Sequence, residues 1–306
     1  MIDTHAHLDF KDFDEDREEV ISRFFDAGGK AIVNIGVDLE RSRKSIEIAE
    51  SHENVFASVG FHPEFFSKAE KEFSIFSAAA DQFSKNSKIN KLINELKKLA
   101  NNKKVVAIGE IGLDYFSHTD EIITNEQKEN QKKGFLVQIE LAQELGLPVI
   151  VHCREAWRDL YEIVKSQSQN SNIQQNPKSQ VSKKIQNTKY KIPDTKFVLH
   201  CYSGEKKDME NFLELPNVHF SFSGNITYPK PIERAEKLAE AVRMIPLDKI
   251  MLDSDSPFLA PQEFRGKRNE PTYVKYIAQK IADIKDISVE EVERVTDKNA
   301  EKFFGT

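Results

Sequence analysis

Eight short apolar runs, most of them rich in β-branched residues, recur along this chain and are separated by segments with helical spacing. Short buried runs that alternate with helices indicate parallel strands joined by helical crossovers. Eight such units, in a chain of this length, are typical of a closed barrel. We therefore predict a single-domain (β/α)8 TIM barrel over residues 1–306, with strands at Ile2–His7, Ala31–Ile35, Val55–Val59, Val105–Ile108, Pro148–Val151, Phe197–Leu199, Val218–Phe222 and Ile250–Leu252.

An open, doubly wound sheet is the alternative arrangement for alternating strands and helices. Such sheets often carry a glycine-rich phosphate loop after a strand, but no G-x-G-x-x-G or P-loop pattern follows any of the eight runs. Two of the connecting segments, Glu126–Leu145 and Ile232–Ile245, show apolar residues at three- and four-residue steps. The barrel is therefore favoured over the open sheet.

Side chains able to bind metals follow at least five of these runs, at the point where each run ends. In a barrel the carboxyl ends of all strands converge on one mouth, where catalytic residues are found. His5 and His7 would face the same side, because side chains of a strand alternate with a period of two. The sequence therefore predicts a metal site built from His5, His7, Glu110, His152, His200 and Asp255.

Four histidines with two or three carboxylates exceed the needs of one tetrahedral zinc ion. They suit two divalent cations, Mg²⁺, Mn²⁺ or Zn²⁺, that share a bridging carboxylate. We expect Glu110 to bridge the two ions. His5 and His7 would bind one ion, and His152 and His200 would bind the other. Asp255 is expected to bind the first ion and to orient or deprotonate the attacking water, so that Glu110 and Asp255 are the predicted catalytic residues. Such a centre is suited to hydrolysis.

At this point the chain resembles the TatD-type metal-dependent hydrolases of the amidohydrolase superfamily. The similar stretches lie in the family's order along nearly the whole chain: Ile2–Asp9, Gly60–Pro63, Ala107–Tyr115, Pro148–Ala156, Leu199–Gly204, Phe220–Gly224, Asp253–Pro261 and Arg265–Pro271. The resemblance implies a TIM barrel with two divalent ions and a deoxyribonuclease activity, often described as a 3′ to 5′ exonuclease. By position it also implies the same six metal ligands.

The chain departs from the family's usual Glu-Thr-Asp at Asp253-Ser254-Asp255, where the first carboxylate is one methylene shorter. We expect Asp253 to support the metal ligands from behind, and His62 to orient a ligand or the substrate. Arg154, Tyr202 and Ser203 are candidate substrate contacts, since a guanidinium fork suits a phosphate.

Three functions remain open from the residues alone. A phosphodiesterase acting on DNA is favoured by Arg154 and by the basic loop Arg265–Arg268. An amide or ester hydrolase, for instance a deacylase of aminoacyl-tRNA, could use the same centre, because this fold supports many substrates. A metal-binding scaffold without activity is disfavoured by the open coordination position left for water.

Composition restricts the class of protein further. The formal net charge is −6, which does not indicate a general nucleic-acid binder, so positive charge at the site must hold any phosphate. No run approaches the roughly 18 apolar residues of a membrane span. Two cysteines, Cys153 and Cys201, argue against a disulfide framework. We expect a cytoplasmic monomer or weak oligomer with no obligate protein partner.

Two insertions interrupt the barrel pattern. Residues 64–90 follow the third strand, at the mouth, and carry several phenylalanines before the helical stripe Ile89, Leu92, Ile93, Leu96 and Leu99. Residues 166–195 are rich in Ser, Gln and Asn, and are expected to be flexible. The second insertion precedes the sixth strand, so we place it at the opposite end of the barrel from the site.

Overall fold

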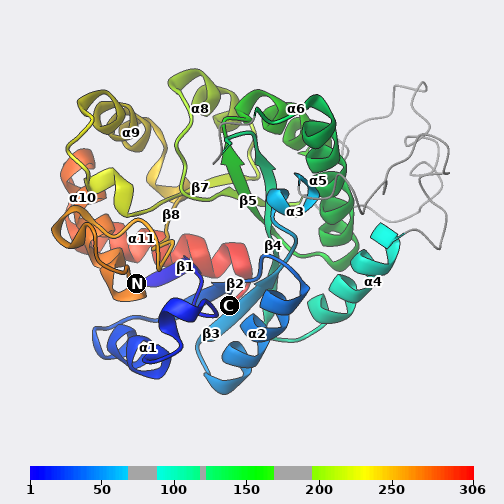
Figure 1. Cartoon of the computed structure of the whole chain (residues 1–306). Coiled ribbons are helices and arrows are strands. Elements are labelled where there is room, and N and C mark those ends of the chain that lie inside the picture. The colour runs from blue at the N-terminus through cyan, green and yellow to red at the C-terminus, as the bar shows by residue number, and fades with distance from the viewer. Residues whose placement is uncertain (68–87, 118–121, 169–194) are drawn as a thin grey trace.

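Eight parallel strands pair in the order in which they occur in the chain (Figure 1). The computed structural model describes residues 1–67, 88–117, 122–168 and 195–306. The strands are β1 (Ile2–Ala6), β2 (Ala31–Ile35), β3 (Val55–Val59), β4 (Val105–Asp114), β5 (Val149–Arg154), β6 (Phe197–Leu199), β7 (Val218–Phe222) and β8 (Ile250–Leu252).

The first and last strands meet and nearly close the sheet into a barrel. Ala6 forms a parallel bridge with Ser256, just beyond β8. The His7 N–H donates to the Ser256 carbonyl at 2.8 Å, and the Asp255 N–H donates to the His5 carbonyl at 2.9 Å. The predicted (β/α)8 barrel is therefore confirmed.

Helices surround the strands on the outside of the barrel (Figure 1). Asp38, Thr124 and Ser288 cap α2, α5 and α11 by accepting a backbone N–H from the first turn. The α-helices are α1 (Arg17–Asp26), α2 (Leu39–Ser51), α3 (Pro63–Ser67), α4 (Lys88–Ala100), α5 (Asn125–Leu145), α6 (Trp157–Ser168), α8 (Lys206–Leu213), α9 (Ile232–Met244), α10 (Val274–Lys285) and α11 (Val289–Phe304). Short 3₁₀ turns are η1 (Lys11–Phe13), η4 (Gly224–Thr227), η5 (Leu247–Lys249), η6 (Gln262–Phe264) and η7 (Pro271–Tyr273).

Two strands are longer than the apolar runs predicted. β4 continues to Asp114 and β5 to Arg154, because the two strands remain paired from Ile111↔Val151 to Asp114↔Arg154. Glu110 therefore lies inside β4 rather than after it. The added residues of β4 and β5 include polar side chains that face the mouth of the barrel. A search for apolar runs therefore ends before these strands do.

The larger part of both insertions, residues 68–87 and 169–194, lies outside the described residues. The helical stripe that follows the first insertion forms α4, in which Ile89 and Leu96 are buried. None of the helices in the described residues combines the length and apolar composition needed to cross a bilayer.

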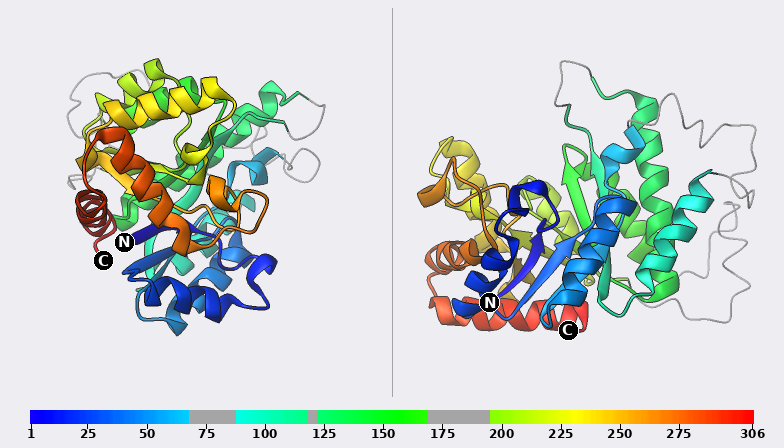
Figure 2. Two further views of the ribbon diagram at one scale, coloured as in Figure 1. Left: turned by 90° about the vertical axis from the view of Figure 1, so that its left-hand side faces the viewer. Right: turned by 60° about the horizontal axis from the view of Figure 1, so that its bottom comes forward.

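The last helix covers the end of the barrel at which the strands begin (Figure 2). Ala300, Phe303 and Phe304 of α11 form one apolar cluster with residues of six strands. The Asp297 carboxylate accepts the Ile2 N–H at 2.7 Å, and the Asn299 amide donates to the Ile250 carbonyl at 2.7 Å. α11 thus joins the first and last strands from below, and the opposite end of the barrel remains open.

His219 of β7 lies at this covered end, packed against the Phe303 ring at 5.2 Å. The pKa of His219 is lowered to about 4, first by burial and then by the charges of Lys249, Lys196 and Lys302. An unfolded chain has a histidine pKa near 6.5. Above that pH the ring is neutral in both states, and as the pH falls from 6.5 towards 4 only the unfolded chain gains the proton, so stability is lost.

We predict that His219→Gln weakens this acid sensitivity. Between pH 7.5 and 4.5 the variant should lose less unfolding free energy than the wild type, by about 1–3 kcal/mol, since one pKa unit corresponds to about 1.4 kcal/mol. Urea denaturation in the presence of a chelator measures this difference. Equal losses in the two proteins would contradict the prediction.

Candidate metal centre

The open end of the barrel gathers the predicted metal ligands from five strands. His5 and His7 lie at the end of β1, and the hydrogen bond from Asp255 to the His5 carbonyl fixes the segment after β8 against them. The Nε2 atoms of His5 and His7 are 3.2 Å apart. The Asp255 Oδ1 is 3.8 Å from the His5 Nε2 and 3.6 Å from the His7 Nε2. These three side chains form one set of converging donors.

Glu110 connects this set to a second one. Its Oε1 lies 2.8 Å from the His152 Nδ1 and 2.8 Å from the His200 Nε2. Its Oε2 faces the other way, 3.5 Å from the His5 Nε2 and 3.9 Å from the His7 Nε2. The two oxygens of one carboxylate therefore serve two different pairs of histidines.

The histidine rings fit the requirements of metal ligands. The Nε2 atoms of His5, His7 and His200 point towards carboxylates, while their buried Nδ1 atoms have no hydrogen-bond partner among the described residues. The rings of His5 and His200 stack in parallel, 3.9 Å between centroids. Buried imidazoles that converge on carboxylates form a donor set for divalent cations.

The surrounding charges keep both carboxyl groups ionised. Burial alone would raise the pKa of Glu110, but the charge of His200 and hydrogen bonds from His152, His200 and His5 hold it well below its usual value. Burial likewise opposes ionisation of Asp255, and hydrogen bonding to His7 together with the other histidines lowers its pKa. Ionised carboxylates are the form that binds a cation.

A buried polar layer supports the ligands from below. The Asp253 carboxylate accepts the Cys201 N–H at 3.0 Å and the hydroxyls of Ser221 and Ser223. Cys201 directly follows His200, so Asp253 fixes the backbone that carries this ligand. The Asp253 side chain, one methylene shorter than the family's usual glutamate, thus reaches all three donors.

Asp114, which the sequence suggested only as a loop-fixing residue or a substrate contact, lies directly beside a predicted ligand. Its Oδ2 lies 3.1 Å from the His152 Nε2, on the side of the ring that faces away from Glu110. Burial would lower the pKa of His152, but Asp114 and Glu110 together raise it to about 10. The signal was present in the spacing, since Asp114 lies four residues after Glu110 on what proves to be one continuous strand.

His62 lies beside the same histidine. Its Nε2 is 3.9 Å from the Glu110 Oε1, and its ring packs edge-to-face on His152 at 4.5 Å. Burial and the charge of His152 lower the pKa of His62 to about 4. The ring is therefore neutral at pH 7, and it lines the cavity above Glu110.

A sequence model described as TatD related DNase matches residues 2–305 of this chain. The chain belongs to the TatD family. A relative in Bacillus subtilis, named uncharacterized metal-dependent hydrolase YabD, is 32% identical over 99% of this chain and 98% of its own length. The 3'-5' ssDNA/RNA exonuclease TatD of Erwinia amylovora is 30% identical over the full length of both chains. Among solved structures, the TatD homologue YJJV of Escherichia coli has a TM-score of 0.77 at 25% identity, covering 100% of this chain and 98% of that one.

The chain is thus a metal-dependent hydrolase of the TatD type. Of the three predicted substrate contacts, two line cavities and one is buried. Arg154 follows His152 by two residues and lines the cavity above the ligands, with its guanidinium 3.5 Å above the Phe116 ring centroid. Ser203 lines a neighbouring cavity of about 730 Å³ that Arg154 also borders. Tyr202 was wrongly predicted as a substrate contact. It is fully buried between Trp157 and Phe220 and donates to the Glu205 carbonyl.

The basic loop that follows β8 has a structural role in this TatD-family chain. Arg268 binds Asp16 through two hydrogen bonds of 2.6 Å each, and Arg265 stacks on the Tyr228 ring at 4.3 Å. Asn269 is fully buried. This loop therefore fixes the rim of the mouth and gives little support to a phosphate contact.

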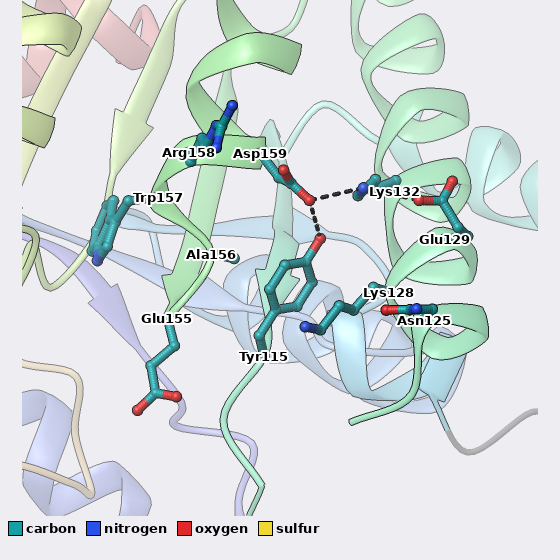
Figure 3. A pocket seen from close by; sticks show the side chains of 10 residues that line it. All are labelled: Tyr115, Asn125, Lys128, Glu129, Lys132, Glu155, Ala156, Trp157, Arg158 and Asp159. Atoms are coloured by element: carbon teal, nitrogen blue, oxygen red, sulfur yellow. Dashed lines mark hydrogen bonds and ion pairs between the residues drawn. The ribbon is translucent and has the colours of Figure 1, made fainter. Parts of the chain in front are cut away.

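Tyr115 also fixes a loop. Figure 3 shows its ring between α5 and α6, beside a cavity of about 380 Å³. Its hydroxyl donates to Asp159 at 2.8 Å, and the Lys132 ammonium contacts the same carboxylate at 2.8 Å. The residue directly after Asp114 is thereby fastened to two helices of the barrel wall.

Proposed function

We propose that this chain is a two-metal phosphodiesterase that cleaves DNA, acting as a deoxyribonuclease of the 3′–5′ exonuclease type. The observation that carries the proposal is the position of Glu110, whose two oxygens face separate pairs of histidines at 2.8–3.9 Å. A shared carboxylate of this kind holds two divalent ions a few Å apart in phosphodiesterases and nucleases.

The residues of the site divide the work of hydrolysis. Bound divalent cations would polarise the phosphoryl group and offset the charge that develops on it. Asp255 is ionised because its pKa is lowered, so its carboxylate can accept a proton from the attacking water. Arg154, at the wall of the same cavity, presents a guanidinium fork that suits a pair of phosphate oxygens.

The relatives support a nucleic acid as substrate. The Erwinia amylovora protein carries the name of a single-stranded DNA and RNA exonuclease, and a Pantoea ananatis protein with the same name is 27% identical over 100% of this chain. Other relatives are named only as metal-dependent hydrolases. Because these names specify no substrate, the test also measures hydrolysis of the ester bond of an aminoacyl-tRNA.

The test compares substrates with one enzyme preparation. Protein freed of metal with a chelator is supplied with Mg²⁺, Mn²⁺ or Zn²⁺ and incubated with end-labelled single- and double-stranded DNA, RNA and a mischarged tRNA. We expect stepwise release of nucleotides from DNA with at least one metal. Deacylation of the tRNA without any cleavage of DNA would replace the proposal by the ester hydrolase. Equal DNA cleavage by a Glu110→Gln preparation would reveal a contaminating nuclease.

A further inference from the structure

Besides the predicted metal ligands, the cavity above Glu110 is lined by apolar side chains, by the carboxylates Asp38 and Glu64, and by Arg154. It measures about 660 Å³. Its apolar lining comes from the four segments that follow β8, β1, β2 and β3, and consists of Phe258, Phe10, Val37 and Phe65, the last of these in α3. Arg154 lines the cavity from β5, on the other side of the ligands. A ligand that fits this arrangement has a flat apolar part and an anionic part separated by a short spacer.

Phe258 is the most unusual member of the apolar side. Its side chain is 49% exposed, and among the large apolar side chains that are exposed in the described parts of the chain it is the only aromatic one. Its backbone is nevertheless fixed, because the Asn269 amide donates to the carbonyls of Phe258 and Ser254 at 2.6 Å each and the Phe258 N–H donates to the Asp255 carbonyl at 2.8 Å. An exposed aromatic residue on a fixed loop binds with little loss of conformational entropy.

Phe10 forms the second wall beside Phe258. The two rings are nearly perpendicular, at 84°, with 5.8 Å between centroids. The guanidinium of Arg41 covers Phe10 at 4.5 Å from the ring centroid, and Arg41 is itself bonded to the Asp9 carbonyl at 2.9 Å. Phe10 is thus held in place as a side wall, while Phe258 presents its ring to the cavity.

Both rings adjoin the metal ligands. The His7 ring lies 4.8 Å from Phe10 and 6.1 Å from Phe258, measured between centroids. A phosphate held at the ligand cluster would therefore be within one nucleotide of a base resting against Phe258. The apolar corner and the phosphate position match the two halves of a single nucleotide.

We propose that Phe10 and Phe258 form a subsite that stacks the terminal base of a single-stranded nucleic acid while its phosphate lies at the Glu110 centre. The inference rests on the proposed function and adds a specificity-determining element to it. Stacking on an aromatic ring accepts any base, because every base has a π-face. It requires a base that has left its own stack, so the subsite selects single-stranded or frayed ends over an intact duplex.

The experiment uses paired oligodeoxynucleotides that differ only in the terminal residue, which carries thymine in one and no base in the other. One pair has this residue at the 3′ end and another at the 5′ end, and the far end carries the label. For an enzyme that attacks the 3′ end, the difference should appear in the 3′ pair. There the wild type with its preferred metal should cleave the base-bearing oligonucleotide about tenfold or more faster in kcat/KM than the one without the base, the size of effect expected for one stacked base. Phe258→Ala should reduce this ratio to near one, whereas Phe258→Trp should keep it.

Ile287→Ala is the matched control. Ile287 is also an exposed apolar residue, 37% exposed, but it lies between α10 and α11, away from the mouth, so this variant should retain the wild-type ratio. A wild-type ratio near one, or an unchanged ratio in Phe258→Ala, overturns the subsite and leaves the proposed function intact. If the wild type cleaves no oligonucleotide with any metal, the proposed function fails and the subsite fails with it.

Discussion

Replacing Glu110 by glutamine is expected to lower kcat/KM for hydrolysis at least about a thousandfold, roughly 4 kcal/mol of transition-state stabilisation. A glutamine keeps the shape of the side chain, but one of its two terminal atoms becomes an N–H donor. Whichever way the amide turns, either the His5–His7 side or the His152–His200 side loses its oxygen ligand. Because one bridging residue serves both donor sets, we expect bound metal to fall together with activity.

Metal content per chain, measured by inductively coupled plasma mass spectrometry after dialysis, checks this result alongside kinetics on single-stranded DNA. Glu290→Gln, the same change in the exposed first turn of α11, should behave as the wild type. A Glu110→Gln variant with full metal content and more than a tenth of the wild-type rate would show that Glu110 does not bridge two ions.

Asp255→Asn should lower kcat about 10²- to 10⁴-fold, the usual contribution of a general base, with a much smaller effect on KM. The wild-type carboxylate is ionised well below neutral pH because hydrogen bonding to His7 and the neighbouring histidine charges outweigh the effect of burial on its pKa. Asparagine keeps the backbone hydrogen bond to the His5 carbonyl and tolerates the left-handed backbone found at this residue, φ 53°. It cannot accept the proton of the attacking water.

The control for this variant is Asp286→Asn, because Asp286 has the same backbone conformation, φ 54°, at the end of α10. Its activity should equal that of the wild type. Rates are to be followed from pH 5 to 9. A kcat for Asp255→Asn within fivefold of the wild type across this range would remove Asp255 from the role of base.

Much of the barrel was predictable from the sequence because its strands are buried on both faces. Such strands appear as continuous apolar runs, and β2, β3, β6, β7 and β8 begin and end where the runs do. β4 was predicted too short, because the part after Ile108 contains two glycines and two carboxylates and is a strand only through its pairing with β5.

The convergence of the predicted ligands at the mouth could be expected for a similar reason. The strand period places His5 with His7, and His152 with Arg154, on one side whatever the details of packing. Asp114 was not placed beside His152, because the end of β4 was not predicted. Tyr202 was predicted wrongly for a different reason. Its position two residues after His200 does not determine the direction of its side chain, which packs between Trp157 and Phe220.

The meeting of the two chain ends has a consequence for biosynthesis. β1 pairs with the segment after β8, and α11 binds both from below. During translation His5 and His7 leave the ribosome long before Asp255 and α11. A nascent chain therefore has no complete donor set and no closed barrel until the segment from β8 to α11 has also been made.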